Sequence, residues 1–112
     1  MSMKQVVMYT VIYEAEAIQD LQSILEYYAK EVSLAQAETM NEKITASIAT
    51  LQEMPLRCPK TDFTTHDDIR KMSLIGLPYL AYFLVNEDAH QVNVLRIVHG
   101  SRQQPAIISD AS

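Results

Sequence analysis

Hydrophobic and polar positions follow two different periods along this chain, and the changes of period mark its elements. A β-rich run of valines, tyrosines and aliphatic residues predicts a first strand over residues 4–13. The spacing then becomes helical, and the positions that share one helix face are Ala17, Leu21, Ile24, Leu25 and Tyr28. This pattern predicts a strand that leads directly into an amphipathic helix.

A second helix is predicted to open at Ser33. The run Ser33-Leu-Ala-Gln36 matches a capping box, in which the hydroxyl and the side-chain amide each satisfy one free backbone donor. The apolar face continues to Leu51, and Pro55 is expected to end the helix because proline cannot continue it. Only a few residues separate the two helices, so they are expected to form an antiparallel hairpin.

From about Ile69 the period falls to two, which is typical of strands. Residues 69–74, 79–85 and the run beginning at Val92 predict three further strands, separated by turns at 75–78 and 86–89. The order is therefore β-α-α-β-β-β, an α+β fold with a helical hairpin packed on one face of a mostly antiparallel four-stranded sheet. We expect one domain over residues 1–105 and a C-terminal tail over 106–112, with Pro105, Ile107 and Ile108 packing back.

Composition narrows the class of protein. The chain has 112 residues, of which 48% are hydrophobic, enough for one core. No apolar stretch approaches the ~20 residues that span a bilayer, and the first residues lack an apolar signal, so a cytoplasmic location without membrane contact is expected. Cys58 is the only cysteine, which excludes an intramolecular disulfide and a cysteine-based metal cage and favours a partly buried packing role.

Charge is unevenly distributed. The net charge of −5 resides in residues 1–56, which carry three lysines against eight acids. Residues 57–102 carry six basic side chains against five acids. A protein that binds nucleic acid by neutralising phosphates is normally far more basic, which disfavours general nucleic-acid binding.

The last predicted strand carries the most informative chemistry. Arg96 lies inside the apolar run, and His99 and Arg102 follow at its exit. An unpaired guanidinium in apolar surroundings is costly, so Arg96 is either a structural ion-pair partner or part of a surface that contacts a polyanion or an acidic protein. Regular alternation would place Arg96 with Val92, Val94 and Val98, opposite Leu95, Ile97 and His99.

Several site types are absent from the sequence. The chain has no Gly-rich phosphate loop, no His-x-x-x-His or Cys-x-x-Cys pair and no Gly-x-Ser-x-Gly elbow, so neither a metal nor a cofactor is expected. The remaining candidates are Arg70, Tyr82, Arg96, His99 and Arg102. Arg70 and Arg96 come from different strands of one sheet and can converge. Such a set can clamp a phosphodiester and move a proton, or form a protein-binding patch; residue types alone do not decide.

The chain as a whole resembles the RelE/ParE superfamily of bacterial type II toxin–antitoxin toxins. The matching stretches cover roughly residues 4–105. They comprise Ala17, Asp20-Leu21, Ile24 and Tyr27-Tyr28 on the first helix; Ile48, Leu51 and Pro55; Ile69-Arg70; Gly76-Leu77-Pro78-Tyr79 with Tyr82; and Leu95-Arg96-Ile97-Val98-His99-Gly100-Ser101-Arg102.

This resemblance implies a plasmid-stabilisation type of toxin that a cognate antitoxin neutralises. Toxins that resemble RelE cut mRNA on the ribosome, whereas those that resemble ParE inhibit DNA gyrase by protein contact. The ending of this chain and its few lysines favour the ParE branch, with DNA contacted only through the antitoxin. A ribosome-dependent endoribonuclease and an inactive antitoxin-binding member remain the alternatives.

Site residues follow from the same resemblance. Target binding is expected at Arg70, Arg96, His99 and Arg102. If the chain is a nuclease, the catalytic candidates are Arg70, Tyr82, Arg96 and His99. Antitoxin binding is expected at Leu21, Leu25, Tyr28 and Tyr79.

Overall fold

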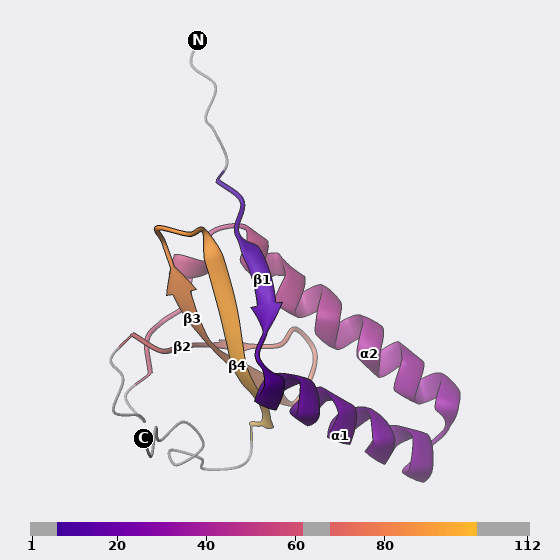
Figure 1. Ribbon diagram of the computed structural model, residues 1–112. Helices are drawn as coiled ribbons and strands as arrows, with labels where there is room; N and C mark the ends of the chain where they lie inside the picture. Colours follow the sequence, from indigo (N-terminus) through magenta and orange to yellow (C-terminus); the bar gives the residue numbers. More distant parts are fainter. Residues whose placement is uncertain (1–6, 62–67, 101–112) are drawn as a thin grey trace.

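The computed structural model of the protein describes residues 7–61 and 68–100. Its elements are β1 (Thr10–Tyr13), α1 (Ala15–Glu31), α2 (Leu34–Ala49), the short 3-10 helices η1 (Thr50–Gln52) and η2 (Pro55–Arg57), β2 (Arg70–Ser73), β3 (Tyr79–Asn86) and β4 (Gln91–His99) (Figure 1). This order confirms the predicted β-α-α-β-β-β succession. Arg102 and the expected packing of Pro105, Ile107 and Ile108 lie outside the described residues.

The four strands form one sheet in the order β1-β4-β3-β2. β2 pairs with β3 and β3 with β4 in antiparallel fashion, whereas β1 pairs with β4 in parallel. A parallel pair needs a long connection that brings the chain back to the same end of the sheet, and here the helical hairpin and the β2–β3 hairpin provide it. The sheet is therefore mostly antiparallel, as predicted.

The first strand is shorter than predicted. Within the described residues it begins at Thr10, while Met8 makes only an isolated antiparallel bridge with Glu53. The Tyr9 N–H donates to the Gln52 carbonyl at 2.9 Å. Met8 and Tyr9 thus contact the end of η1 and the residue that follows it, a long-range contact that hydrophobic periodicity does not predict.

The helix boundaries confirm one half of the predicted capping box. The Ser33 hydroxyl accepts a hydrogen bond from the Gln36 N–H at 3.0 Å. The other half is wrong, because the Ser33 N–H donates to the Tyr28 carbonyl at the end of α1 (2.9 Å). α2 also ends at Ala49, well before Pro55, and Pro55 instead opens η2 after Met54, whose φ of 53° lies in the left-handed region.

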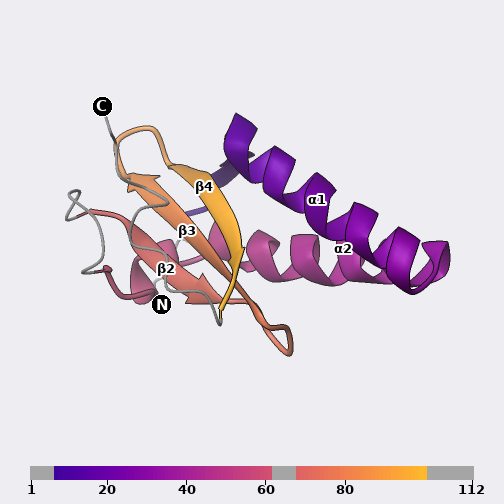
Figure 2. The same cartoon turned by 90° about the horizontal axis from the view of Figure 1, so that it is seen from below.

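The main core lies between the hairpin and one face of the sheet. Figures 1 and 2 show both helices on the same side of the strands. The fully buried side chains of this core include Ala17, Ile44, Ile48, Leu51, Phe83, Val92 and Val94. Burying each large aliphatic or aromatic side chain contributes ~1.5–3 kcal/mol, so this layer dominates the stability of the fold.

A second, smaller cluster lies on the opposite face, called here the helix-free face. Ile69, Tyr82 and Val98 are buried there, with Leu80, Leu84 and Leu95 packed around them. Ile69 directly precedes β2, and the other five residues belong to β3 or β4. On β3 these residues alternate with residues of the main core. The sheet is therefore apolar on both faces.

Candidate functional site

A β-bulge in β4 decides where Arg96 points. Tyr82 is paired with Arg96, but the next residue, Phe83, is paired with Val94, so Leu95 is the extra residue. A bulge interrupts the alternation of side chains, and both Leu95 and Arg96 then belong to the helix-free face. The regular alternation expected from the sequence is wrong here: Val92, Val94 and Ile97 pack in the main core, while Val98 packs on the helix-free face.

Arg96 forms an ion pair with Asp20 of α1. Its Nε lies 2.7 Å from Asp20 Oδ2 and its Nη2 lies 2.9 Å from Oδ1. The Ile97 N–H also donates to Asp20 Oδ2 at 2.9 Å. β1 pairs with β4 only as far as Val94. Beyond that point, the Asp20 carboxylate accepts the backbone hydrogen bond at the edge of β4. The hydrogen bond to Asp20 raises the pKa of Arg96, against the lowering effect of burial. The structural ion-pair interpretation of Arg96 is confirmed.

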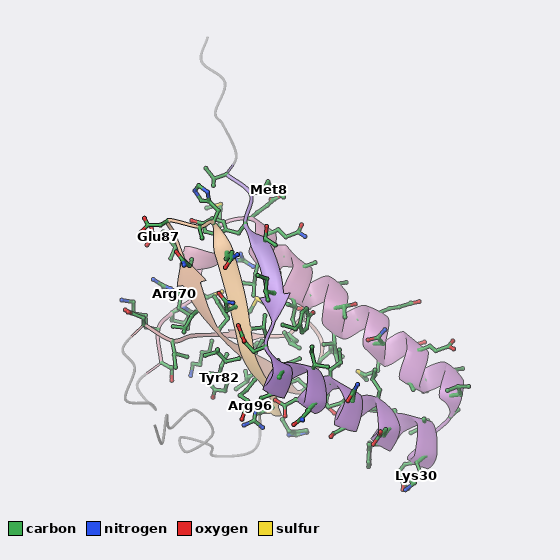
Figure 3. The ribbon with its side chains drawn as sticks, in the orientation of Figure 1. Met8, Lys30, Arg70, Tyr82, Glu87 and Arg96 are labelled. Carbon is green, nitrogen blue, oxygen red and sulfur yellow. The ribbon has the colours of Figure 1, made fainter. Side chains whose placement is uncertain are left out.

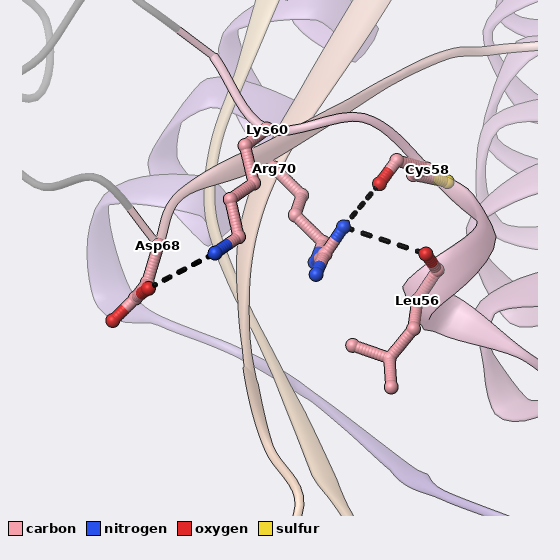
Figure 4. A network of polar contacts seen from close by, with 5 residues as sticks. All are labelled: Leu56, Cys58, Lys60, Asp68 and Arg70. Atoms are coloured by element: carbon pink, nitrogen blue, oxygen red, sulfur yellow. Dashed lines mark hydrogen bonds and ion pairs between the residues drawn. The ribbon is translucent and has the colours of Figure 1, made fainter.

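Arg70 lies far from Arg96 on the other side of the sheet. It is paired with Phe83, whose side chain is in the main core, whereas Arg96 is paired with Tyr82. The Arg70 Nη1 donates to the carbonyls of Cys58 (2.5 Å) and Leu56 (3.4 Å), bracing η2 against β2 (Figure 4). The expected convergence of Arg70 with Arg96 is wrong, because adjacent positions on β3 present their partners to opposite faces.

His99 lies at the end of β4, beside Tyr79. The two rings meet edge to face with centroids 5.5 Å apart. Tyr79 is 8% exposed, and burial, followed by its hydrogen bond to Tyr28, raises its pKa. His99 is thus placed with an aromatic group that includes Tyr27 and Tyr28, and not with Arg96.

One cationic residue on the helix-free face was missed by the sequence analysis. Lys71 is paired with Tyr82, which is paired with Arg96, so the three form one row across β2, β3 and β4. Figure 3 shows Tyr82 and Arg96 near each other, with Arg70 apart. Alternation along β2 was the available signal, since only one of Arg70 and Lys71 can share a face with Tyr82. Tyr82 itself is 5% exposed, and burial raises its pKa.

The helix-free face ends in an acidic depression of about 630 Å³ near the β3–β4 turn. Its lining includes the carboxylates of Asp68, Glu87 and Asp88. Within residues 7–61 and 68–100, no three histidine, cysteine or acidic side chains are placed to hold a metal ion. The depression therefore adds negative charge beside the Lys71–Tyr82–Arg96 row without forming a metal site.

The residues predicted to contact an antitoxin are more buried than a free docking surface requires. Leu21 and Tyr28 are half-buried and pack against the main core, Leu25 is half-buried, and Tyr79 is buried. More exposed apolar side chains lie on the same hairpin, at Ile18, Tyr27, Val32 and Leu34. Helical spacing alone does not distinguish these flanking positions from core positions.

Cys58 is free and buried at 6% exposure. Burial raises the pKa of its thiol, while Arg57 and Arg70 lower it less. Such a thiol is mostly protonated and is a poor nucleophile, as expected for a packing residue.

None of the helices in the described part of the chain is both long and apolar enough to cross a bilayer.

The arrangement of two helices on a four-stranded sheet is found in solved toxin–antitoxin structures. The chromosomal ParDE system from P. aeruginosa matches with a TM-score of 0.70 and 21% identity, over 82% of this chain and 96% of that one. The RelBE2 toxin–antitoxin complex from Mycobacterium tuberculosis matches with a TM-score of 0.57 and 20% identity, over 85% and 94%. At these identities the likeness establishes the fold. Among curated proteins, a search found no match.

The family is established by the sequence itself. The model of the ParE toxin of the type II toxin–antitoxin system parDE matches residues 11–104. Because this match spans most of the chain, the protein belongs to the ParE toxin family. It is a type II toxin of the RelE/ParE superfamily.

Proposed function

We propose that this toxin inhibits DNA gyrase by protein contact and is neutralised by a cognate antitoxin. Membership in the ParE family supports the gyrase target. The observation that carries the proposal is the separation of three of the four nuclease candidates from one another: Arg70 braces η2, His99 contacts Tyr79, and Arg96 is bound to Asp20. A toxin that acts by contact needs no assembled catalytic group. Arg96 inside β4 and His99 at its end remain proposed target-binding positions. Arg102 also remains one, although it lies outside the described residues, whereas Arg70 is no longer proposed because it braces η2.

The Lys71–Tyr82–Arg96 row favours a second candidate, a ribosome-dependent mRNA endoribonuclease. Two cations that flank a phenol are suited to hold a phosphate and to supply a proton. Three features weigh against it: the guanidinium is already paired with a carboxylate, the phenol is buried, and the nearby depression is acidic. Burial raises the pKa of Tyr82, which makes the phenol a weaker proton donor.

A side-by-side assay separates these candidates. The purified chain is added to gyrase with relaxed plasmid, and to a cell-free translation reaction in which mRNA cleavage is mapped. We expect loss of supercoiling with accumulation of cleaved DNA–gyrase complexes, and intact mRNA. Intact supercoiling together with mRNA cuts that Lys71→Ala abolishes and Lys43→Ala leaves unchanged would establish the nuclease instead. Lys43 is the matched control because it lies on α2, away from the sheet.

The antitoxin is proposed to bind across the helical hairpin. Ile18 and Leu25 lie seven residues apart in α1, and Val32 directly follows the end of that helix. Ile18 and Val32 are 44% and 56% exposed. The surrounding first half of the chain carries eight acids against three lysines. An amphipathic antitoxin segment, helical or extended, complements this surface: its apolar residues match the exposed apolar side chains, and its basic residues match the negative charge. Leu21, Tyr28 and Tyr79 then support the surface from beneath.

The open reading frame next to this gene supplies the partner for a test. Its product is co-expressed with the wild-type chain, with Ile18→Lys or with Gln22→Lys, which is an exposed position of α1. We expect the partner to co-purify with wild type and Gln22→Lys, and to be lost with Ile18→Lys. If the partner still co-purifies with Ile18→Lys and is lost only with substitutions on another surface, the antitoxin binds that other surface.

A further inference from the structure

The thioether of Met72 on β2 lies where the main core meets the polar surface of η1 and η2. Its side chain is half-buried and packs against the main core. The Arg57 Nη2 donates toward the Met72 Sδ at 3.8 Å, and the Thr50 Oγ1 lies 3.9 Å from the same sulfur. The Arg57 and Thr50 side chains are both exposed. Solvent therefore reaches the sulfur through a side that carries a cation and a hydroxyl.

The guanidinium of Arg57 is held in this position by three oxygen acceptors. Its Nη1 donates to the carbonyls of Glu53 at 2.9 Å and Met54 at 3.1 Å. Its Nη2 donates to the Thr50 Oγ1 at 3.2 Å as well as to the sulfur. The Thr50 hydroxyl donates in turn to the Ser47 carbonyl at 2.7 Å. Because the planar guanidinium is fixed on three sides, its remaining donor is aimed at the sulfur in advance.

This donor is mismatched to a thioether and well matched to a sulfoxide. A thioether sulfur is a weak hydrogen-bond acceptor, so the contact with Arg57 contributes little as it stands. Oxidation of a methionine adds a polar oxygen and ordinarily disrupts the packing around it. Here an oxygen added toward solvent would meet a charged N–H donor, which forms a stronger hydrogen bond than a neutral one. Oxidation of Met72 would thus replace a weak contact by a strong one.

The geometry also selects one of the two sulfoxide epimers. A thioether sulfur has two lone pairs, and oxidation at one or the other gives opposite configurations. The Arg57 Nη2 and Thr50 Oγ1 lie 3.2 Å apart, closer to each other than either is to the sulfur. They therefore subtend at the sulfur a narrower angle than two tetrahedral lone pairs do, and both face the same lone pair. An oxygen added at that lone pair meets the guanidinium.

We propose that Met72 is a stereospecific modification site for hydroperoxides, and that Arg57 binds the sulfoxide formed there. A sulfur lone pair attacks one peroxide oxygen, so that the S–O bond forms as the O–O bond breaks. The departing hydroxide takes the proton of the transferred oxygen and leaves as water. The sulfur is oxidised by two electrons and the peroxide is reduced. This inference is independent of the target that the toxin binds.

Epimer analysis of the peroxide-treated protein tests the proposal. The folded full-length chain is treated with hydrogen peroxide and digested, and the peptides are given one or the other of the two epimer-specific methionine sulfoxide reductases. Mass spectrometry then measures the sulfoxide that remains at each methionine. We expect one reductase to remove nearly all of the Met72 sulfoxide and the other to leave it. At Met54, which is 71% exposed, each reductase should remove about half.

Two variants and one solvent condition assign the selectivity to the guanidinium. Arg57→Ala is expected to bring the two Met72 epimers close to equal amounts, because the donor is lost. Lys60→Ala is the matched control, since it removes a nearby exposed cation that pairs with Asp68, and it should keep the single epimer. Wild-type chain oxidised in urea should also give equal epimers at Met72. The urea arm needs no substitution and holds even where Arg57→Ala does not fold.

Thermal unfolding reads whether the bound sulfoxide is accommodated. Met72→Leu reports the effect of oxidising the other methionines. Oxidation is expected to change the Tm of wild type and of Met72→Leu equally, within about 2 °C. In Arg57→Ala, oxidation should lower the Tm by ~4–8 °C more than in Arg57→Ala/Met72→Leu, because the sulfoxide there lacks its donor.

Three results would overturn the proposal. Equal epimers at Met72 in the folded wild type would show that the guanidinium does not direct oxidation. A single epimer that persists in a folded Arg57→Ala variant would assign the selectivity to the core packing of Met72 alone. A Met72 that stays reduced while Met54 is fully oxidised would show that peroxide does not reach the sulfur.

Discussion

The two faces of the sheet are both apolar, but they are buried by different means. The face under α1 and α2 is filled by helix side chains such as Ile44 and Ile48, which complete a continuous core. The helix-free face carries a smaller cluster, crossed by the cations of Lys71 and Arg96. The face under the helices therefore holds most of the buried apolar side chains, whereas the helix-free face combines a small apolar cluster with two cationic side chains.

The largest expected effect compares two neighbours on β3. Phe83 is fully buried under the helices, and Phe83→Ala is expected to lower the free energy of unfolding by ~3–5 kcal/mol because it opens a cavity. Leu84 is only half-buried on the opposite face, and Leu84→Ala is expected to cost about 1–2 kcal/mol. Urea denaturation measures both. Equal losses of unfolding free energy in the two variants would contradict the conclusion that the face under the helices contributes more to stability.

The second effect concerns the contact that joins α1 to the edge of β4. Asp20→Ala removes the carboxylate partner of both the Arg96 guanidinium and the Ile97 N–H, and should cost ~2–4 kcal/mol. The matched control is Asp68→Ala, which breaks the exposed 3.5 Å pair with Lys60 and should cost ~0–1 kcal/mol. Thermal and urea unfolding of the two variants measure these two losses of stability. If Asp20→Ala lowers the free energy of unfolding no more than Asp68→Ala does, the Asp20–Arg96 ion pair contributes no more than a surface pair.

A smaller effect tests how the helical layer is held together. Ser33→Ala should lower stability by ~1 kcal/mol because the Gln36 N–H loses its cap. Gln36→Ala should be nearly neutral, since the Ser33 N–H already donates to Tyr28 and does not need the Gln36 side chain. Urea midpoints of the two variants measure the difference. Equal destabilisation by Ser33→Ala and Gln36→Ala would indicate that the reciprocal capping box does form.

The smallest effect appears only at alkaline pH. Burial raises the pKa values of Tyr79 under the helices and Tyr82 on the helix-free face, so the folded state favours both neutral phenols. This stabilisation is present below the ordinary tyrosine value of about 10 and is lost as pH rises above it. Tyr79→Phe and Tyr82→Phe should each flatten the fall of Tm from about pH 9 to about pH 11. We expect the larger change for Tyr79, and an unchanged slope in both variants would contradict the assigned burial.

Much of the fold could be predicted because local signals and tertiary packing agree. The apolar spacing of Ala17, Leu21 and Ile24 predicted α1, and the period of two after Ile69 predicted the hairpins. Errors occur where a distant segment decides the outcome. Tyr28 competes with Gln36 for the Ser33 N–H, and the backbone near Glu53 pairs with Met8.

The candidate site was less predictable than the fold. The residue types on the sheet were found, but a single extra residue, Leu95, changes which side chains share a face with Arg96. Bulges carry no reliable signal in one sequence, since they depend on the register of the partner strand. Alternation along β2 indicated that either Arg70 or Lys71 shares a face with Tyr82, and the register of β2 with β3 decides that it is Lys71.

The sequence by itself determined the order of elements and the membership of the ParE toxin family, because these are encoded in local periodicity and in the order and spacing of motifs along one chain. Only the tertiary structure decided which cation pairs with a carboxylate and which lies beside a tyrosine. Pairing across strands depends on register, and register is fixed by the packing of all four strands and both helices together.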